Sequence, residues 1–143
     1  GYGAKPTDFA ALRQDPFVDF IGEVDEVPPH YYQTSLSVVP LLEGSGTRVK
    51  ILEAMSLGSP VVSTRIGAEG IEAERGLEIL LADEPREFAA AVSRLLAEPQ
   101  LFENLRRAAR RLVEQKYDWR MIGREINRQV EQLAARRRTA RTE

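Results

Sequence analysis

Short apolar runs alternate with segments of helical periodicity along this chain, and that alternation constrains the fold more than any other feature. Strands and helices recur about every 20 residues, and parallel strands need long crossover connections, usually helices, between them. The predicted strands are residues 17–21, 36–39, 60–64 and 77–81. The sequence therefore predicts an α/β fold, a Rossmann-like parallel sheet with helices on both faces.

Proline and capping residues mark where the predicted helices begin. Short helices are expected at residues 8–14 and after Pro28, and a longer one at residues 48–57. The C-terminal third is helical, with Asp83 or Glu84 as the first cap. Its helices begin near Pro85, Pro99 and Trp119. Their inner faces are expected to comprise Phe88, Val92, Leu95 and Leu96, then Leu101, Leu105, Ala108 and Leu112, then Trp119, Ile122, Ile126, Val130 and Leu133.

Composition excludes several kinds of functional site. The 143 residues include no cysteine and one histidine, His30, which rules out disulfide frameworks, thiolate zinc sites and multi-histidine metal centres. No run of 18 apolar residues is present, so no membrane-spanning helix is predicted. The start of the sequence has no signal-peptide pattern, and a cytoplasmic location is the expectation.

Charge is divided unevenly along the chain. Residues 1–103 carry 8 basic and 17 acidic side chains, a balance of −9, whereas residues 104–143 carry 12 basic and 5 acidic ones, a balance of +7. The basic part is either a solvated helix surface or a contact for an acidic domain or an anionic membrane surface. No nucleic-acid partner is expected, because Trp119 fits the apolar stripe instead of a basic face.

A glycine-bearing loop, Gly44-Ser45-Gly46-Thr47, lies between a predicted strand and the helix that follows. Glycine allows close approach to the backbone, and the first N–H groups of a helix attract anions. Arg48 and Lys50 add positive charge in the first turn, where it opposes the helix dipole unless an anion is bound. The loop is either a phosphate-binding site or a purely structural turn.

Glu53 lies in the same helix, seven residues after Gly46 and therefore about 10 Å along the axis. A carboxylate at that place accepts hydrogen bonds from paired hydroxyls such as those of a ribose. A diphosphate beside a sugar diol is what a nucleotide sugar presents. The alternative is an ordinary solvent-facing acid.

The segment GSGTRVKILEAMSLGSPVVST, with IGAEGI downstream, resembles the donor-binding motif of glycosyltransferase family 4, whose retaining enzymes have the GT-B fold. The resemblance extends over residues 1–130 in order. It includes the segment FIGEVDE before the first proline pair, LAD before the helical third, and YDW before the last helix.

The resemblance implies a donor-binding role for nine residues. Glu53 matches the acid that holds the donor ribose, and Val24 and Glu26 match positions near the nucleobase. Gly44, Ser45, Gly46 and Thr47 match the loop that faces the diphosphate and the sugar, and Arg48 and Lys50 supply positive charge. The family needs no metal and no protein nucleophile, so this chain is expected to hold no metal ligand, no cofactor and no catalytic residue. A UDP- or GDP-sugar is its expected substrate.

Two departures from the family pattern stand out. Nine residues separate Glu43 from Glu53, where the family usually has seven between its two acids, so Glu43 is not expected to be the counterpart. The family's diphosphate-gripping Arg/Lys pair lies upstream of the segments present here.

The resemblance implies that the chain is the N-terminally truncated second domain of a GT-B enzyme. Residues 1–118 are expected to form a partial nucleotide-sugar-binding domain, and residues 119–143 a C-terminal helix with a basic tail. The expected function is sugar transfer to a saccharide or lipid-linked acceptor in polysaccharide synthesis. Such an enzyme works in the cytoplasm or at the inner membrane face, and this chain needs an N-terminal acceptor domain for activity. The alternative is a non-catalytic, glycosyltransferase-like or nucleotide-binding interaction module.

Overall fold

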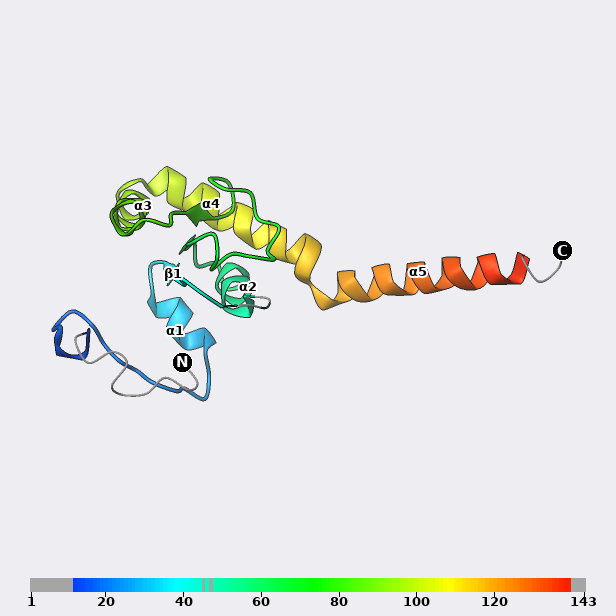
Figure 1. The fold of residues 1–143 in the computed structure, drawn as a ribbon, viewed down its shortest axis with the longest axis horizontal. Helices are drawn as coiled ribbons and strands as arrows, with labels where there is room; N and C mark the ends of the chain where they lie inside the picture. Colours follow the sequence, from blue (N-terminus) through cyan, green and yellow to red (C-terminus); the bar gives the residue numbers. More distant parts are fainter. Residues whose placement is uncertain (1–11, 45, 47, 140–143) are drawn as a thin grey trace.

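The computed structural model describes residues 12–44, 46 and 48–139. Helices and short strands alternate as the sequence predicts (Figure 1). In order they are η2 (Leu12–Gln14, a 3₁₀ turn), α1 (Pro28–Gln33), β1 (Ser37–Val39), α2 (Val49–Ser56), β2 (Val61–Ser63), β3 (Leu80–Leu81), α3 (Pro85–Ala97), α4 (Pro99–Leu112), η3 (Val113–Tyr117, a π-helical turn) and α5 (Trp119–Thr139). The predicted helix at residues 8–14 is described only from Leu12 onward, and residues 8–11 of it lie outside the described residues.

The three strands form one parallel sheet in the order β1-β2-β3. Val62 of the central strand pairs with Val38 on one side and with Leu80 on the other. The predicted parallel sheet is confirmed, but β3 is shorter than residues 77–81. A turn precedes it, in which the Gly76 N–H donates to the Ile79 carbonyl at 2.8 Å, and Gly76 adopts φ +83°.

The predicted strand at residues 17–21 is wrong. This segment runs extended away from the sheet (Figure 1), and Phe17 is 94% exposed. Its start is held by a local turn, in which the Phe17 N–H donates to Oδ1 of Asp15 at 2.9 Å. A strand is stabilised by a neighbouring strand, and the structure places none of β1, β2 and β3 beside this segment.

Helices cover both faces of the sheet because side chains of a strand alternate between faces. Val61 of β2 packs with α2 and α4, in a cluster of Val39, Ile51, Ala54, Met55, Val61, Ala68, Ile79, Ala109 and Leu112. Val62 points to the other face, where it packs with Leu80, Leu95 of α3 and Leu105 of α4. Leu96 was expected in this second cluster but is 56% exposed.

The C-terminal helix α5 extends away from the body of the molecule (Figure 1). Its base is tied down by Glu72, whose N–H donates to the Tyr117 hydroxyl and whose carboxylate accepts from Nζ of Lys116, each at 2.8 Å. The predicted apolar stripe forms, but it is not buried: Trp119 is 84% exposed and Leu133 61%. Among the described elements, α5 makes its main contacts with η3, the turn that leads into it. None of the described helices has the length and apolar character needed to cross a bilayer.

Candidate functional site

The candidate site lies where the three parallel strands end. Their carboxyl ends meet at one edge of the sheet, which is where open α/β sheets bind ligands. Three connections begin there: residues 40–48 lead from β1 to α2, residues 64–70 form the turn after β2, and residues 82–84 link β3 to α3. Most of the residues that the sequence assigns to donor binding belong to the first connection and to α2.

The glycine loop brings the chain from β1 to the start of α2. Gly44 and Gly46 are exposed and adopt φ +131° and +85°, conformations that L side chains disfavour. Ser45 and Thr47, the other two predicted loop residues, lie outside the described residues. Helix α2 has no side-chain cap and no acid in its first turn. Its first N–H groups therefore form a setting that favours an anion.

Arg48 was predicted as a first-turn cation facing an anion, and the structure shows it buried, with 8% of its surface exposed. A Cβ atom on Gly44 would lie 3.2 Å from Nη2 of Arg48, so the guanidinium packs directly against the glycine. Nη2 also donates to the Ile66 carbonyl at 3.5 Å. Arg48 therefore connects the glycine loop to the turn after β2 from within the protein.

Lys50 and Glu53 are both exposed on α2, as the sequence predicts. Within the described part of the chain, neither forms an ion pair. The Lys50 carbonyl accepts a hydrogen bond from the Tyr31 hydroxyl at 3.1 Å. Burial, and secondarily the nearby Glu53 carboxylate, raise the pKa of Tyr31 above its ordinary value. Because Lys50 and Glu53 are exposed and form no ion pair with a described residue, both side chains are available to a ligand.

Glu53 also borders an apolar groove of about 410 Å³ between α2 and the base of α5. The α2 wall of the groove comprises Val49, Leu52, Glu53 and Ser56, and the opposite wall comprises Val113, Tyr117, Trp119 and Ile122. Sequence reasoning missed this groove, because it assigned Trp119 and Ile122 to a buried stripe.

Val24 and Glu26 lie on the extended segment that leads into α1. Val24 is half-buried and Glu26 is exposed. Neither forms a hydrogen bond or an ion pair with another described residue. The structure therefore shows no bond between these two residues and the described residues of the glycine loop. Their role near a nucleobase stays a prediction.

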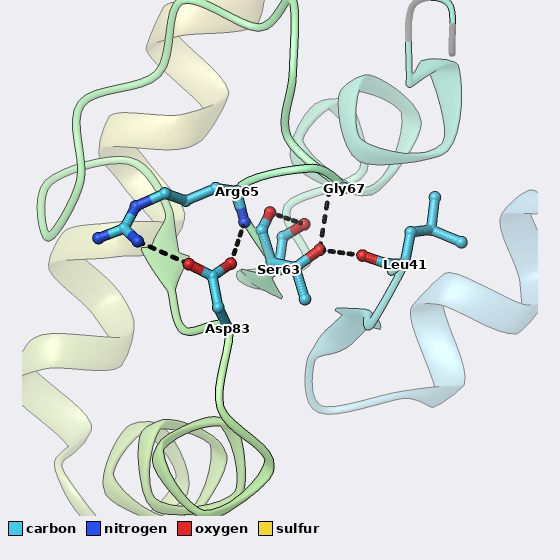
Figure 2. Close-up of polar contacts among 6 residues, drawn as sticks. Leu41, Ser63, Arg65, Gly67 and Asp83 are labelled. Atoms are coloured by element: carbon cyan, nitrogen blue, oxygen red, sulfur yellow. Dashed lines mark hydrogen bonds and ion pairs between the residues drawn. The ribbon is translucent and has the colours of Figure 1, made fainter. Parts of the chain in front are cut away.

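Two hydroxyl residues at the end of β2 hold the neighbouring loops together (Figure 2). The Ser63 hydroxyl lies within hydrogen-bonding distance of two carbonyl oxygens, that of Val39 at 3.2 Å and that of Thr64 at 3.0 Å. The Thr64 hydroxyl donates to the Leu41 carbonyl at 2.5 Å and accepts from the Gly67 N–H at 2.9 Å. Sequence reasoning did not identify this role of the two hydroxyls. Two consecutive hydroxyls at the end of a buried strand, with a glycine three residues later, are the signal that could have revealed them.

The sequence predicted Asp83 or Glu84 as the cap of α3, and Asp83 does not occupy that position. Its carboxylate instead accepts hydrogen bonds from Arg65 in the turn after β2. Glu84 occupies the cap position of α3 but makes no side-chain capping bond. Among the described residues, no group of three histidine, aspartate or glutamate side chains is placed to hold a metal ion.

Comparisons with known proteins identify the family and support the fold. Residues 1–98 match the family described as glycosyl transferases group 1. The C-terminal domain of the group 1 glycosyl transferase LpcC from Francisella tularensis is 22% identical, with a TM-score of 0.63, over 71% of this chain and 53% of that one. Sucrose-phosphate synthase from Thermosynechococcus elongatus is 27% identical, with a TM-score of 0.61, over 74% of this chain and 27% of that one. No curated protein matches the chain. The chain thus spans about half or less of the solved structures it resembles.

Proposed function

Because the chain belongs to the group 1 family of glycosyl transferases, we propose that it binds the nucleoside-diphosphate sugar donor from which the sugar is transferred. The observation that carries this proposal is the start of α2. Two exposed glycines precede it, its first turn holds no acid, and Lys50 is exposed in that turn. The buried guanidinium of Arg48 adds positive charge behind the loop.

These groups act on the leaving diphosphate. As the bond between sugar and diphosphate breaks, negative charge grows on the phosphate oxygens. N–H groups and cations that are already oriented toward that charge stabilise the transition state without reorganising. The helix dipole, Lys50 and Arg48 have this effect without a divalent metal. Transfer with retention then needs no protein nucleophile from this chain.

Glu53 holds the donor ribose in this proposal. It lies one turn after Val49, about 6 Å along α2, and its exposed carboxylate accepts hydrogen bonds from a ribose diol. The nucleobase then extends toward Val24 and Glu26, across α1. Tyr31 of α1 supports this arrangement, since its hydroxyl bonds to the backbone of Lys50.

A second domain supplies the acceptor site, and the exposed apolar stripe of α5 packs against it. Isolated helices are only marginally stable in water, yet α5 leaves Trp119, Ile126, Val130 and Leu133 exposed. Contact with an acidic domain fits the +7 balance of residues 104–143. The saccharide or lipid-linked acceptor is then bound between the two domains. Attachment of α5 to an anionic membrane is the competing outcome.

Titration calorimetry with UDP and with GDP tests donor binding. Wild-type protein is expected to bind one of them, with an affinity that does not change when EDTA is added. The variant Glu53→Gln should weaken binding about 10- to 100-fold, because it removes charge-assisted hydrogen bonds to the ribose.

Glu98→Gln is the matched control, since it neutralises an exposed acid at the C-terminal end of α3. It should leave the affinity unchanged. Absence of binding to both nucleotides by folded wild-type protein would contradict the proposal. Binding without transfer, once the acceptor domain is supplied, would indicate a non-catalytic module.

A further inference from the structure

Thr64 occupies a central place among the loops of the candidate site. It follows β2 directly and is 4% exposed. Its hydroxyl uses both kinds of hydrogen bond, donating to the Leu41 carbonyl and accepting from the Gly67 N–H (Figure 2). Its backbone adds two more, because its N–H donates to the Val39 carbonyl at 3.3 Å and its carbonyl accepts from Ala68 at 3.1 Å.

These bonds fix the start of the glycine loop. Leu41 lies two residues after β1 and three before Gly44, so the Thr64 hydroxyl holds the chain just before it reaches the glycines. Arg48 holds the other end of the same loop, through its contact with Gly44 and its bond to the Ile66 carbonyl. Both anchors connect to residues 64–70, the turn after β2.

In the turn after β2, Gly67 has no room for even a Cβ atom. A Cβ atom on Gly67 would lie 2.4 Å from the Ser63 hydroxyl, 2.7 Å from the Val39 carbonyl and 2.9 Å from the Thr64 hydroxyl. The turn therefore sits directly on the ends of β1 and β2. Its close packing at Gly67 makes it a support for the more exposed glycine loop.

We propose that Thr64 is a positioning residue of the donor site: its hydroxyl holds the loop after β1 where the N–H groups before α2 face the diphosphate. This inference rests on the proposed function. Thr64 acts through the loop in this proposal, because its side chain is buried and both of its hydroxyl interactions are made within the protein. Loss of the hydroxyl leaves the Leu41 carbonyl and the Gly67 N–H without these partners, and the loop then samples positions in which fewer N–H groups reach the anion.

Thr64→Val tests the proposal, because it keeps the shape of the side chain and removes the hydroxyl. We expect its affinity for UDP or GDP, whichever the wild type binds, to fall about tenfold. Hydrogen exchange of the Gly67 amide in the ligand-free protein should become faster. Thr64→Ser keeps the hydroxyl and should restore both properties. Thr64→Ala removes the same bonds and is used if Thr64→Val does not fold.

Two controls separate positioning from general stability. Thr34→Val removes a hydroxyl bonded to a backbone carbonyl, that of Tyr31, at the C-terminal end of α1. Ile51→Val lowers stability through the core of α2. All affinities are measured well below the unfolding transition. Both controls should bind nucleotide as the wild type does.

The outcomes distinguish the two proposals. If wild-type protein binds neither UDP nor GDP, the proposed function fails, whereas Gly67 exchange still reports whether Thr64 holds the turn. If wild-type protein binds nucleotide, the positioning role is overturned by unchanged affinity in Thr64→Val, by equal weakening in either control, or by lack of recovery in Thr64→Ser.

Discussion

Arg65 donates two hydrogen bonds to the carboxylate of Asp83, one from its backbone N–H to Oδ1 at 2.8 Å and one from Nη1 to Oδ2 at 2.7 Å (Figure 2). This pair joins the turn after β2 to the residue that follows β3. The Arg65 side chain is 67% exposed and the Asp83 side chain 41%. Solvent therefore weakens the ion pair, while the bond to the backbone N–H holds the turn itself.

This difference predicts unequal effects of removing the two partners. Asp83→Ala should lower the free energy of unfolding by about 1–2 kcal/mol, since it removes a charge-assisted bond to the backbone. Arg65→Gln keeps that bond and should cost about 0.5 kcal/mol or less, as exposed ion pairs do. Urea unfolding of both variants measures this. Equal losses would mean that the side-chain pair, and not the backbone bond, stabilises the junction.

Gly67→Ala should be strongly destabilising, because the added methyl group would meet the Val39 carbonyl at 2.7 Å and the Ser63 hydroxyl at 2.4 Å. Overpacking of this kind costs about 3 kcal/mol or more when backbone must move. Gly70→Ala is the control. Gly70 has φ +81° and open space around it, so only conformational strain of about 1–2 kcal/mol is expected.

Thermal unfolding of the two glycine variants checks the prediction. A double variant, Gly67→Ala with Ser63→Ala, should recover part of the loss by removing the nearest obstructing atom. Equal unfolding midpoints for Gly67→Ala and Gly70→Ala would show that the turn adjusts without cost.

The raised pKa of Tyr31 predicts that the stability of the protein depends on pH in the alkaline range. Burial and the Glu53 carboxylate raise its pKa above the ordinary 10.0. Above pH 10 the unfolded chain loses this proton before the folded protein does, so stability falls as pH rises until the folded phenol also ionises. Glu53→Gln should move the Tyr31 pKa back toward its ordinary value. Ultraviolet titration of phenolate, with Tyr31→Phe as the reference, measures the shift, and an unchanged titration curve would contradict it.

The lowered pKa of Glu103 predicts that the stability of the protein depends on pH in the acid range. Hydrogen bonds from Arg106 and then Arg107 lower its pKa from 4.5 to about 2. A lowered carboxylate pKa contributes stability that is present above pH 4.5 and is lost as pH falls toward 2. Carbon NMR of the Glu103 carboxyl should titrate in that range. Glu103→Gln should make the loss of stability with acid less steep, and an identical acid limb in both proteins would rule this contribution out.

The exposed apolar stripe of α5 predicts that substitutions in it abolish binding to another domain without changing the stability of the body. Ile126→Glu and Leu133→Glu change exposed positions, so the free energy of unfolding of the body should change by less than about 0.5 kcal/mol. Binding to the acceptor domain should nevertheless be lost. Gel filtration with that domain, and sedimentation with vesicles of anionic lipid, measure the two possible contacts. Loss of vesicle binding alone would assign the stripe to a membrane.

Features encoded by nearby residues could be predicted from the sequence. Helices that begin at Pro28, Pro85 and Pro99 were found because proline fixes the first helical residue. The parallel sheet followed from the spacing of strands and helices. The start of α2, with its glycines and the exposed Lys50 and Glu53, was predicted for the same reason, since it occupies one continuous segment.

Features that depend on distant partners could not be predicted. Residues 17–21 have strand composition, but none of the strands β1, β2 and β3 of the described chain lies beside them. The α5 stripe has core composition, yet Trp119, Ile126, Val130 and Leu133 are exposed in the described part of the chain. Arg48 points inward because Gly44 leaves room for its guanidinium and the Ile66 carbonyl accepts from it. The role of Thr64 likewise needs the ends of two strands to be adjacent, which sequence periodicity does not report.

The attachment of α5 at Glu72 has a mechanical consequence. Helix α5 contains 21 residues and is therefore about 30 Å long, and it leaves the body from a base that Lys116 and Tyr117 fasten to this one residue. Glu72 belongs to the segment that continues from the turn after β2. The helix thus acts as a lever whose pivot lies next to the turn after β2, and a tilt of about 5° at the pivot displaces its tip by about 3 Å.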